Sequence, residues 1–433
     1  MIRTHSISCS LPKAEADALN RESGRLYTKT LVTHYRVYRK KGNKRRHWLS
    51  PHAAEKLGDY LLRDDPPLLH AHSKDAAQQG FYKAITTARA NRHLGAKFPY
   101  KRKRWRTTIW KETGIRVEET ETGTLLLLAR ARGLAPIRVP LPPAITRLPR
   151  WRVREVRLVW DRAARHYTWH VVVEDGQRPA PPPGTAVVAV DLGEVHPAAC
   201  TDGTETVIIA ARRVRATQQY TAKRLAELRR QQARKTTGSR RHRRLQRRKN
   251  RFLAQQRRRV RDLEHKVSRA VVAFAVERRA GTIALGDVRT VAEGKRLHAT
   301  SQQKVSSWSH GRQRQYITYK AEAAGIRVVL VDEAYSSQTC PNPACKHRYK
   351  PQGRVYRCPA CGLRAPPKGH PDAVGAANLL SRFLYGAVGQ IRPPPHTKYR
   401  RPAVSAAGKR RVPACGCVVP WTRRHPKGTR ARG

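Results

Sequence analysis

The segment Val331–Leu380 decides the fold of this chain and reads VDEAYSSQTCPNPACKHRYKPQGRVYRCPACGLRAPPKGHPDAVGAANLL. It contains two close cysteine pairs in turn-rich sequence, Cys340 with Cys345 and Cys358 with Cys361. This spacing is typical of a zinc ribbon, in which four thiolates hold one tetrahedral Zn²⁺. We expect a structural site, because four thiolates leave no open coordination position. Two disulfides are the alternative, which the regular spacing and the expected lack of a signal peptide disfavour.

Structured segments enclose the ribbon on both sides. Before it, Ile326–Val331 (IRVVLV) is an apolar, β-branched run that predicts a buried strand, with Asp332 and Glu333 directly after it. After it, Asp372 precedes AVGAANLLSRFL, in which apolar residues recur at helical spacing. Carboxylates therefore stand at a strand end and at a helix start, with a zinc module looped out between them. A module inserted in this way is expected to position or contact a ligand.

The charge of the chain predicts its partners. Lys and Arg number 90 against 30 Asp and Glu, which gives a net charge of +60 over 433 residues. Such an excess needs a polyanion to neutralise it, and nucleic acid is the expected one. A basic membrane-surface protein is the alternative, disfavoured because the charge is not confined to one amphipathic helix. We expect no membrane-spanning segment, and the cysteine usage fits a reducing cytoplasm.

The N-terminal part predicts strands interrupted by helices. Residues 2–9 suggest one strand, and helical patterns follow at 14–31, 50–62 and 73–94. Further strand patterns occur at 124–129, 137–141, 151–160 and 166–174. They predict a β-barrel of about five to seven strands, with the helices inserted after its first strand. The proline-rich residues 177–184 predict a linker and a domain boundary.

Two basic segments are candidate nucleic-acid surfaces. Residues 98–110 (FPYKRKRWRTTIW) mix cations that bind phosphates with aromatic rings that stack on bases. Residues 212–280 predict helices that include RRHRRLQRRKNR, with too few acids to pair with this charge. The alternatives are an edge strand for the first segment and an ordinary solvated helix face for the second. The candidate contacts are Lys101, Arg102, Lys103, Arg104, Trp105, Arg106, Trp110, Arg243, Arg244, Arg247 and Arg248.

Two further buried strands end near carboxylates. Thr185–Asp191 is a small-residue and apolar run that ends in Asp191, and Thr282–Val288 contains Gly286 and Asp287. An aspartate at the end of a first strand is where nucleases of the ribonuclease H fold hold a metal ion. The motif V-D-x-G also occurs in unrelated ATPases.

The order of these elements resembles the RuvC-like nuclease domain of the transposon-encoded TnpB proteins and of the compact type V CRISPR effectors. The resemblance covers nearly the whole chain. It is strongest at VDLG around Asp191, EHKVSR at 264–269, YKAEAAGI at 319–326, the four ribbon cysteines, and HPDAVGAANLL at 370–380.

The resemblance implies a multidomain α+β fold: an OB-like wedge β-barrel with an inserted helical recognition lobe, and an RNase H-like RuvC domain with an inserted zinc ribbon. The implied domains are the first wedge strand (1–10), the recognition lobe (11–95), the wedge barrel (96–180), the first part of the RuvC-like domain (184–336, with basic helices at 212–280), the zinc ribbon (337–369), the final RuvC-like helix (370–386) and a basic, disordered tail (387–433).

The resemblance also implies a function, RNA-guided cleavage of DNA. The expected partners are a guide RNA and a double-stranded DNA target beside a short flanking motif, and no membrane. The protein is expected to act as a monomer or as a dimer on one RNA, in a prokaryotic cytoplasm near the nucleoid. The chemistry of such a nuclease is two-metal hydrolysis, in which about three carboxylates hold two Mg²⁺ ions about 4 Å apart.

The catalytic carboxylates match the family only in part. Asp191 and Asp372 align with the first and last acids, but Gly286 stands where the family has a strand-ending glutamate. Our hypothesis is that Glu333 supplies the missing ligand. Asp287 is the weaker, second candidate. Side chains alternate along a strand, so the side chain of Asp287 should point to the face opposite residue 286. Glu333 could instead pair with an arginine.

Two other functions stay open from the sequence. One is an RNA-guided DNA-binding protein or repressor with weak or no nuclease activity, consistent with Gly286. The other is a ribosome-type RNA binder with a zinc ribbon, which would need no acid cluster at Asp191 and Asp372.

The chain contains one further close cysteine pair, Cys415 and Cys417. Two cysteines are too few for a metal site of their own.

Overall fold

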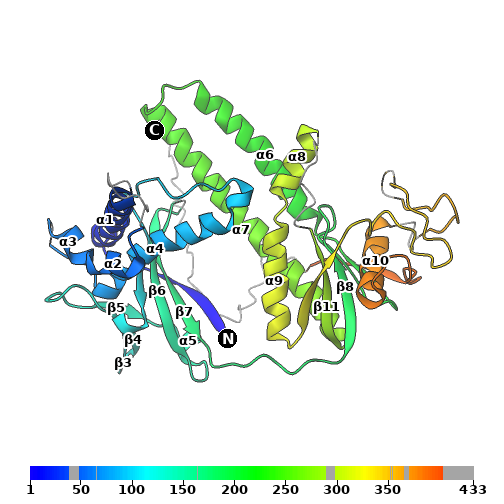
Figure 1. Cartoon of the computed structure of the whole chain (residues 1–433), viewed down its shortest axis with the longest axis horizontal. Coiled ribbons are helices and arrows are strands. Elements are labelled where there is room, and N and C mark those ends of the chain that lie inside the picture. Colours follow the sequence, from blue (N-terminus) through cyan, green and yellow to red (C-terminus); the bar gives the residue numbers. More distant parts are fainter. Residues whose placement is uncertain are drawn as a thin grey trace, which may run out of the picture. The chain divides into compact units, whose positions relative to one another are not determined.

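The structure is a computed structural model that describes residues 1–38, 48–64, 66–162, 164–288, 298–351, 353, 355–364 and 370–402. The chain forms two compact units, of which the first contains Met1–Gln177 and the second spans Arg178–Ser405. Each has its own sheets and helices (Figure 1). The mixed α/β, multidomain fold class predicted from the sequence is confirmed. Cys415 and Cys417 lie outside the described residues.

The strands of the first unit form two antiparallel sheets around one core. One sheet has the order β1-β7-β6-β2, and the other the order β3-β4-β5. Their bounds are β1 (Ile2–Ser8), β2 (Thr108–Lys111), β3 (Ile115–Thr120), β4 (Gly123–Leu128), β5 (Ile137–Pro140), β6 (Arg152–Asp161) and β7 (His166–Glu174). Alternate residues of β7 are buried, as its sequence pattern predicts. Among the described residues no strand pairing joins the two sheets, so a closed barrel stays a prediction.

The helices of the first unit are inserted between β1 and β2. They are α1 (Lys13–Tyr38), α2 (Pro51–Lys56), α3 (Gly58–Leu62) and α4 (Ala71–Ala90), and a short α5 (Pro143–Thr146) follows β5. A buried asparagine ties α1 to the sheet: the side chain of Asn20 donates to the carbonyl of Leu158 at 3.1 Å and accepts from the amide of Thr108 at 2.8 Å. The inserted helices therefore have a fixed base on the strands around them.

The second unit is built on one mixed sheet of six strands in the order β12-β11-β8-β9-β10-β13. The strands are β8 (Ala186–Asp191), β9 (Ala198–Thr201), β10 (Thr206–Ile209), β11 (Ala280–Asp287), β12 (Arg327–Asp332) and β13 (Thr397–Arg400). β11 runs parallel to both β8 and β12, whereas β8, β9 and β10 are antiparallel neighbours. We did not predict β9, because its sequence AACT carries a weak strand signal.

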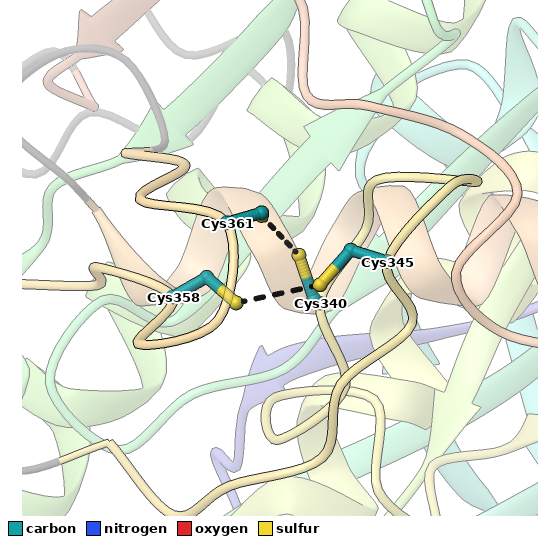
Figure 2. A group of neighbouring side chains, drawn as sticks. All are labelled: Cys340, Cys345, Cys358 and Cys361. Atoms are coloured by element: carbon teal, nitrogen blue, oxygen red, sulfur yellow. Dashed lines mark hydrogen bonds between the residues drawn. The ribbon is translucent and has the colours of Figure 1, made fainter.

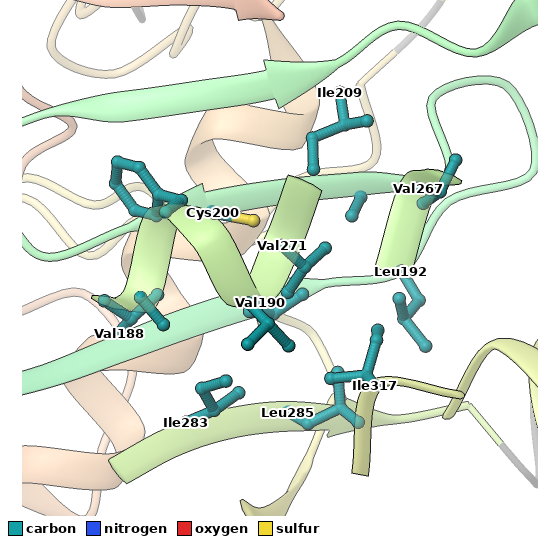
Figure 3. Close-up of a cluster of buried hydrophobic side chains, with 14 of the residues drawn as sticks. Val188, Val190, Leu192, Cys200, Ile209, Val267, Val271, Ile283, Leu285 and Ile317 are labelled. Atoms are coloured by element: carbon teal, nitrogen blue, oxygen red, sulfur yellow. The ribbon is translucent and has the colours of Figure 1, made fainter. Parts of the chain in front are cut away.

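Helices cover both faces of this sheet. The helices are α6 (Arg212–Ala233), α7 (Arg240–Glu277), α8 (Ala299–Ser307), α9 (His310–Ala323) and α10 (Pro371–Tyr385). On one face, Val267 and Val271 of α7 and Ile317 of α9 pack on β8 and β11 (Figure 3). On the other face, α10 packs through Leu379 and Leu380. Within the described residues no helix is both long and apolar enough to cross a membrane.

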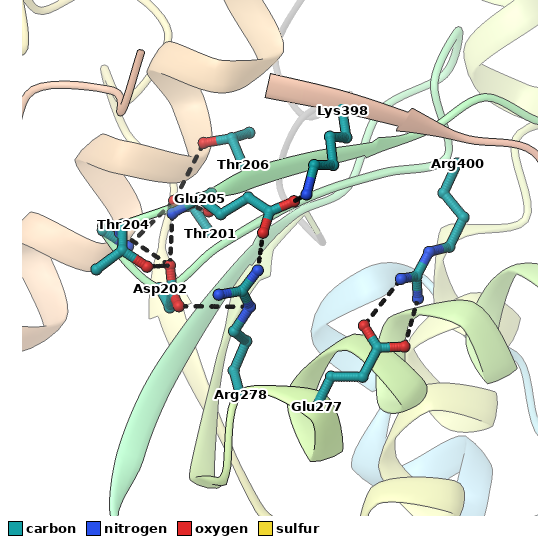
Figure 4. Close-up of polar contacts among 10 residues, drawn as sticks. Thr201, Asp202, Thr204, Glu205, Thr206, Glu277, Arg278, Lys398 and Arg400 are labelled. Atoms are coloured by element: carbon teal, nitrogen blue, oxygen red, sulfur yellow. Dashed lines mark hydrogen bonds and ion pairs between the residues drawn. The ribbon is translucent and has the colours of Figure 1, made fainter. Parts of the chain in front are cut away.

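The segment after α10 corrects one prediction. We expected residues 387–433 to be disordered, but Thr397–Arg400 forms β13, which adds to the sheet parallel to β10. Ion pairs hold this strand: Lys398 contacts Glu205 at 3.0 Å and Arg400 contacts Glu277 at 2.8 Å (Figure 4). The basic composition misled us, because these cations meet acids from distant segments. Residues 403–433 lie outside the described part of the chain.

Candidate functional site

The register of three parallel strands brings their carboxyl ends to one place. Leu285 of β11 pairs with Val190 of β8, and Gly286 pairs with Val331 of β12. Ala189, Ala284 and Val331, one from each of these strands, are buried together against α10. Side chains two residues apart on a strand share a face. Asp191, Gly286 and Glu333, each two residues further on, therefore lie on the α10 side.

Gly286 leaves room that Glu333 fills. A Cβ atom at position 286 would overlap the carboxylate of Glu333, so this carboxylate occupies the space that a side chain at 286 would need. A second glycine has a similar role across the site, because a Cβ atom on Gly375 of α10 would overlap the carboxylate of Asp191. Glycine at both positions is what allows the two carboxylates to enter the same pocket.

Asp372 reaches this pocket from the start of α10. His370 is the N-cap, and its Nδ1 accepts the backbone N–H of Asp372 at 3.3 Å. Pro371 fits the first turn, where its missing N–H is not needed. The charge of Asp372 acts directly on Asp191. Segments 181 residues apart in the sequence (191 to 372) are thus neighbours in space.

The carboxylates of the pocket raise one another's pKa values. Burial and then the charge of Asp372 raise the pKa of Asp191 to about 7. Burial, followed by the charges of Asp191, Asp287 and Asp332, raises the pKa of Glu333 to about 9. Oε1 of Glu333 is buried and has no hydrogen-bond partner among the described residues. A pocket of repelling oxygens with a buried, unpartnered acceptor fits a hard divalent cation such as Mg²⁺.

The other candidate, Asp287, lies on the opposite face of β11 from Gly286. Its carboxylate is 3.8 Å from Nη1 of Arg314 on α9, the helix that packs on the other side of the sheet. Glu333 makes no ion pair with an arginine within the described part of the chain. It is its neighbour Asp332, exposed at the strand end, that contacts Arg382 at 3.0 Å.

Two histidines at this site were missed by the sequence analysis. His196, His370 and Asp372 each offer a ligand atom, and these atoms lie within 4.8 Å of one another. His196 is buried in the β8–β9 connection. The one sequence signal for it is its position five residues after Asp191. His370 was visible two residues before Asp372, but nothing in the sequence says that the two imidazoles meet.

The four predicted cysteines form one cluster. Sγ of Cys340 is 3.6 Å from Sγ of Cys361, and Sγ of Cys345 is 3.7 Å from Sγ of Cys358 (Figure 2). In a tetrahedral site with Zn–S bonds of about 2.3 Å, neighbouring sulfurs are about 3.8 Å apart. All four thiols are free, so the disulfide alternative is not what the structure shows. The cluster is compatible with the predicted zinc ribbon.

The ribbon is fixed to α10. Tyr356 is fully buried and packs with Cys340 and Cys358 against Val374 of the helix. The buried side chain of Asn378 donates to the carbonyls of Ser336 at 2.6 Å and Thr339 at 2.8 Å, at the base of the ribbon. The helix that presents Asp372 to the acidic pocket therefore also carries the zinc module.

The predicted nucleic-acid contacts differ in exposure. Those with exposed side chains are Lys101, Arg102, Lys103, Arg104, Trp105, Arg243, Arg244, Arg247 and Arg248. Trp110 was a wrong prediction: it is 1% exposed, packs in the core between the sheets, and donates its indole N–H to the carbonyl of Ala129 at 2.8 Å. Arg106 is only partly exposed and lies 5.9 Å from the Tyr27 ring.

Exposed residues of the 98–110 segment line two adjoining grooves in the first unit. A groove of about 840 Å³ is lined by Arg21, Arg25, Lys29 and Arg102–Trp105, among others. A second, of about 680 Å³, shares Arg21 and Trp105 with the first. Trp105 is 44% exposed, and the guanidinium of Arg21 lies 4.8 Å from its ring. The grooves thus combine several cations with one accessible aromatic face.

Loss of one ribbon thiolate should release zinc. Cys345→Ser removes one of four ligands, so we expect the zinc content after dialysis against a weak chelator to fall from about one ion per chain to well below half. Elemental analysis of the purified protein measures this. Cys200→Ser, which changes a buried cysteine of β9, is the matched control and should retain its zinc. Equal zinc in both variants would contradict the assignment.

Removing one charge from the acidic pocket should stabilise the metal-free protein at high pH. The folded-state pKa of Asp191 is about 7 against an ordinary 3.8, so ionisation of this group costs stability as the pH rises through this range. We expect Asp191→Asn to unfold at least about 2 °C above the unchanged chain at pH 8 without magnesium, and the difference to shrink at pH 5. Differential scanning calorimetry measures the unfolding temperature of each protein at both pH values.

The matched control for that comparison is Glu121→Gln, at an exposed turn carboxylate of the first unit. It should show no pH-dependent difference. Equal unfolding temperatures for Asp191→Asn and the unchanged chain at pH 8 would argue against a repelling cluster.

Two family models match the chain. Residues 310–379, which include α9, β12, the ribbon and the first part of α10, match the Cas12f1-like TNB domain. Residues 170–292, from the end of β7 through β11, match a family described as a probable transposase, OrfB_IS605. The matched regions contain Asp191, Glu333 and Asp372, together with the four ribbon cysteines.

One curated protein is similar in sequence over a limited stretch. The CRISPR-associated endodeoxyribonuclease Cas12f1 of Sulfoacidibacillus thermotolerans is 32% identical over 103 residues. The match covers 23% of this chain and 23% of that protein.

One of the similar solved structures extends the likeness to the fold of most of the chain. A Cas12f1 structure, determined by cryo-electron microscopy as an sgRNA–target DNA complex, is similar with a TM-score of 0.59 at 11% identity, covering 85% of this chain and 83% of that one. The mini-RNA-guided endonuclease CRISPR-Cas_phi3 aligns with a TM-score of 0.47 at 9% identity, over 89% of this chain and 93% of that one. The resemblance predicted from the sequence is confirmed: the chain is similar to the TnpB proteins and compact type V effectors.

Proposed function

We propose that this protein is an RNA-guided DNA endonuclease that cleaves by metal-dependent hydrolysis. The observation that supports the proposal is that Asp191, at the end of β8, interacts electrostatically both with Glu333, which follows β12, and with Asp372, at the start of α10. The relatives are an endodeoxyribonuclease and a probable transposase, and the similar solved structure is a complex with sgRNA and target DNA. Carboxylates that can hold cations, a cysteine cluster that can hold zinc and a strongly basic chain fit this activity.

Each carboxylate has a proposed role in the reaction. Two bound Mg²⁺ ions would supply an activated water and stabilise the leaving oxygen of the phosphodiester. Asp191 and Asp372 would hold these ions through their carboxylates. Glu333 would provide the ligand that the strand position of Gly286 cannot. Both raised pKa values mean that Asp191 and Glu333 must release protons before they can bind a cation.

The ribbon would position nucleic acid for this site. Val374 and Asn378 hold the ribbon on the helix that carries Asp372 in its first turn. A nucleic-acid strand bound by the ribbon would therefore have a fixed position relative to the acidic pocket. The exposed arginines of α7 and the grooves around Trp105 would bind the guide RNA and the target duplex beside its flanking motif. In this proposal residues 1–180 form the wedge and recognition lobe, 184–336 and 370–386 the nuclease, and 337–369 the target-binding ribbon.

A protein that binds DNA under RNA guidance but cleaves weakly is the second candidate. The specific observation in its favour is that position 286 has no side chain, so the carboxylate that fills its space comes from Glu333, after the neighbouring strand β12. The pKa of Glu333 is raised to about 9 without a cation, so its carboxyl group holds a proton at neutral pH. Binding of both cations would then be less favourable, because this proton must first be released.

Cleavage of matched DNA tests the proposal and separates the two candidates. The RNA that co-purifies with the protein is sequenced, and a plasmid carrying the matching sequence beside a randomised flank is incubated with and without Mg²⁺. We expect magnesium-dependent cutting, reduced at least about 100-fold by Glu333→Gln. Glu322→Gln, at an exposed carboxylate of α9, is the matched control and should cut at the unchanged rate.

The outcomes of this assay are distinct. Binding of matched DNA without cutting would replace the first candidate by the second. Cutting that survives Glu333→Gln but is lost in Asp287→Asn would transfer the third ligand to Asp287. A protein that neither binds nor cuts matched DNA would contradict both.

Trp105 should contribute to nucleic-acid binding in the first unit. Stacking of a base on an exposed aromatic ring is worth about 1–3 kcal/mol, so we expect Trp105→Ala to weaken binding at least about fivefold. Fluorescence anisotropy with the co-purifying RNA and, separately, with the DNA duplex would show which of the two uses the ring. Tyr60→Ala is the matched control, because Tyr60 is 58% exposed and carries a stacked Arg63 at 4.0 Å but lines neither groove. Unchanged affinity of Trp105→Ala for both nucleic acids would contradict this role.

A further inference from the structure

A second donor set adjoins the acidic pocket and contains nitrogen as well as oxygen. Ligand atoms of His196, His370 and Asp372 lie within 4.8 Å of one another, and the two imidazole rings are 5.1 Å apart at 62°. His196 is 3% exposed. Besides the four ribbon cysteines, this is the one group in the described part of the chain with three such donors so close together.

The backbone holds the two imidazoles in place. The connection after β8 folds back so closely that a Cβ atom on Gly193 would lie 2.6 Å from the carbonyl oxygen of His196, which requires glycine there. His370 is the N-cap of α10 and accepts the backbone N–H of Asp372 through Nδ1; a metal ion bound by His370 would replace this hydrogen bond, because a neutral imidazole offers one lone pair. Tyr399 of β13 packs edge-on against both rings, at 6.2 Å from His196 and 5.9 Å from His370. Three segments that are distant in the sequence therefore form this cluster: the β8–β9 connection, the start of α10 and β13.

The donor chemistry indicates which cations it would take. Mg²⁺ prefers oxygen ligands and keeps much of its water, whereas imidazole suits transition metals such as Fe²⁺, Ni²⁺ and Zn²⁺; Mn²⁺ binds imidazole more weakly than these metals but more readily than Mg²⁺ does. We propose that His196, His370 and Asp372 form a mixed nitrogen–oxygen site for a divalent transition metal, sharing Asp372 with the carboxylate pocket of Asp191 and Glu333. Two positions with different donors would then stand side by side.

This site has a consequence for the reaction, which rests on the proposed nuclease function. One cation would be held by carboxylates alone and the other by two imidazoles and Asp372, so Mn²⁺ should support cleavage at lower concentration than Mg²⁺. Metal binding itself needs neither guide nor target. It can therefore be tested even if the nuclease proposal fails.

Pulsed electron paramagnetic resonance of bound Mn²⁺ tests the site directly. The full-length protein is freed of nucleic acid, with its ribbon zinc retained, and loaded with one equivalent of Mn²⁺. We expect ¹⁴N modulation from imidazole ligands, which would be lost in the double variant His196→Gln/His370→Asn. Titration should show that each single variant binds Mn²⁺ at least about 10-fold more weakly. His166→Ala, at an exposed histidine of the first unit, is the matched control. It should keep the ¹⁴N modulation and the Mn²⁺ affinity of the unchanged chain.

The variants are chosen so that folding does not decide the result. Asparagine at 370 can still accept the N–H of Asp372 as an N-cap, and the unfolding temperature of each metal-free variant is compared with that of the unchanged chain. Mn²⁺ bound without ¹⁴N modulation, or bound equally well by both single variants, would overturn the proposal. Nitrogen-ligated Mn²⁺ in a protein that cuts no matched DNA would support the metal site and contradict the nuclease instead.

Discussion

The parallel pairing of β8, β11 and β12 is the constraint on which the site depends. Because side chains alternate along a strand, this register fixes which residues face α10 and which face α7 and α9. The apolar Ala189, Ala284 and Val331 form the floor on the α10 side, and the next residues on that side are Asp191, Gly286 and Glu333. A slip of one residue would turn the carboxylates into the opposite core.

The geometry also has an electrostatic cost. Carboxylates that are partly withdrawn from water and aimed at one another hold protons more tightly, as the raised pKa values of Asp191 and Glu333 show. Such an arrangement lowers the stability of the protein without a cation, and a bound cation would recover it. The glycines at 286 and 375 bring the charges closer still, since each leaves space that a carboxylate occupies. The pocket is therefore formed at the expense of stability, which is typical of functional sites.

Much of this could be predicted from the sequence, because the signals were local. The two cysteine pairs predicted their own cluster, and strands ending in Asp191 and near Glu333 were clear apolar runs. The predictions that were wrong or missing concern contacts between residues far apart in the sequence. Trp110 sits in a basic, aromatic run, yet the alternation of β2 turns it into the core. β13 is ordered by Glu205 and Glu277, which no local pattern connects to Lys398 and Arg400. The pairing of His196 with His370 likewise exists only once β8 and α10 meet.

The central claim is that Asp191, Glu333 and Asp372 share one cation pocket, and anomalous diffraction from crystals soaked in Mn²⁺ tests it most directly. The account predicts a manganese peak within about 2.0–2.6 Å of carboxylate oxygens from all three residues. A map in which manganese density never touches Glu333, or in which Asp191 and Asp372 bind no common ion, would contradict it.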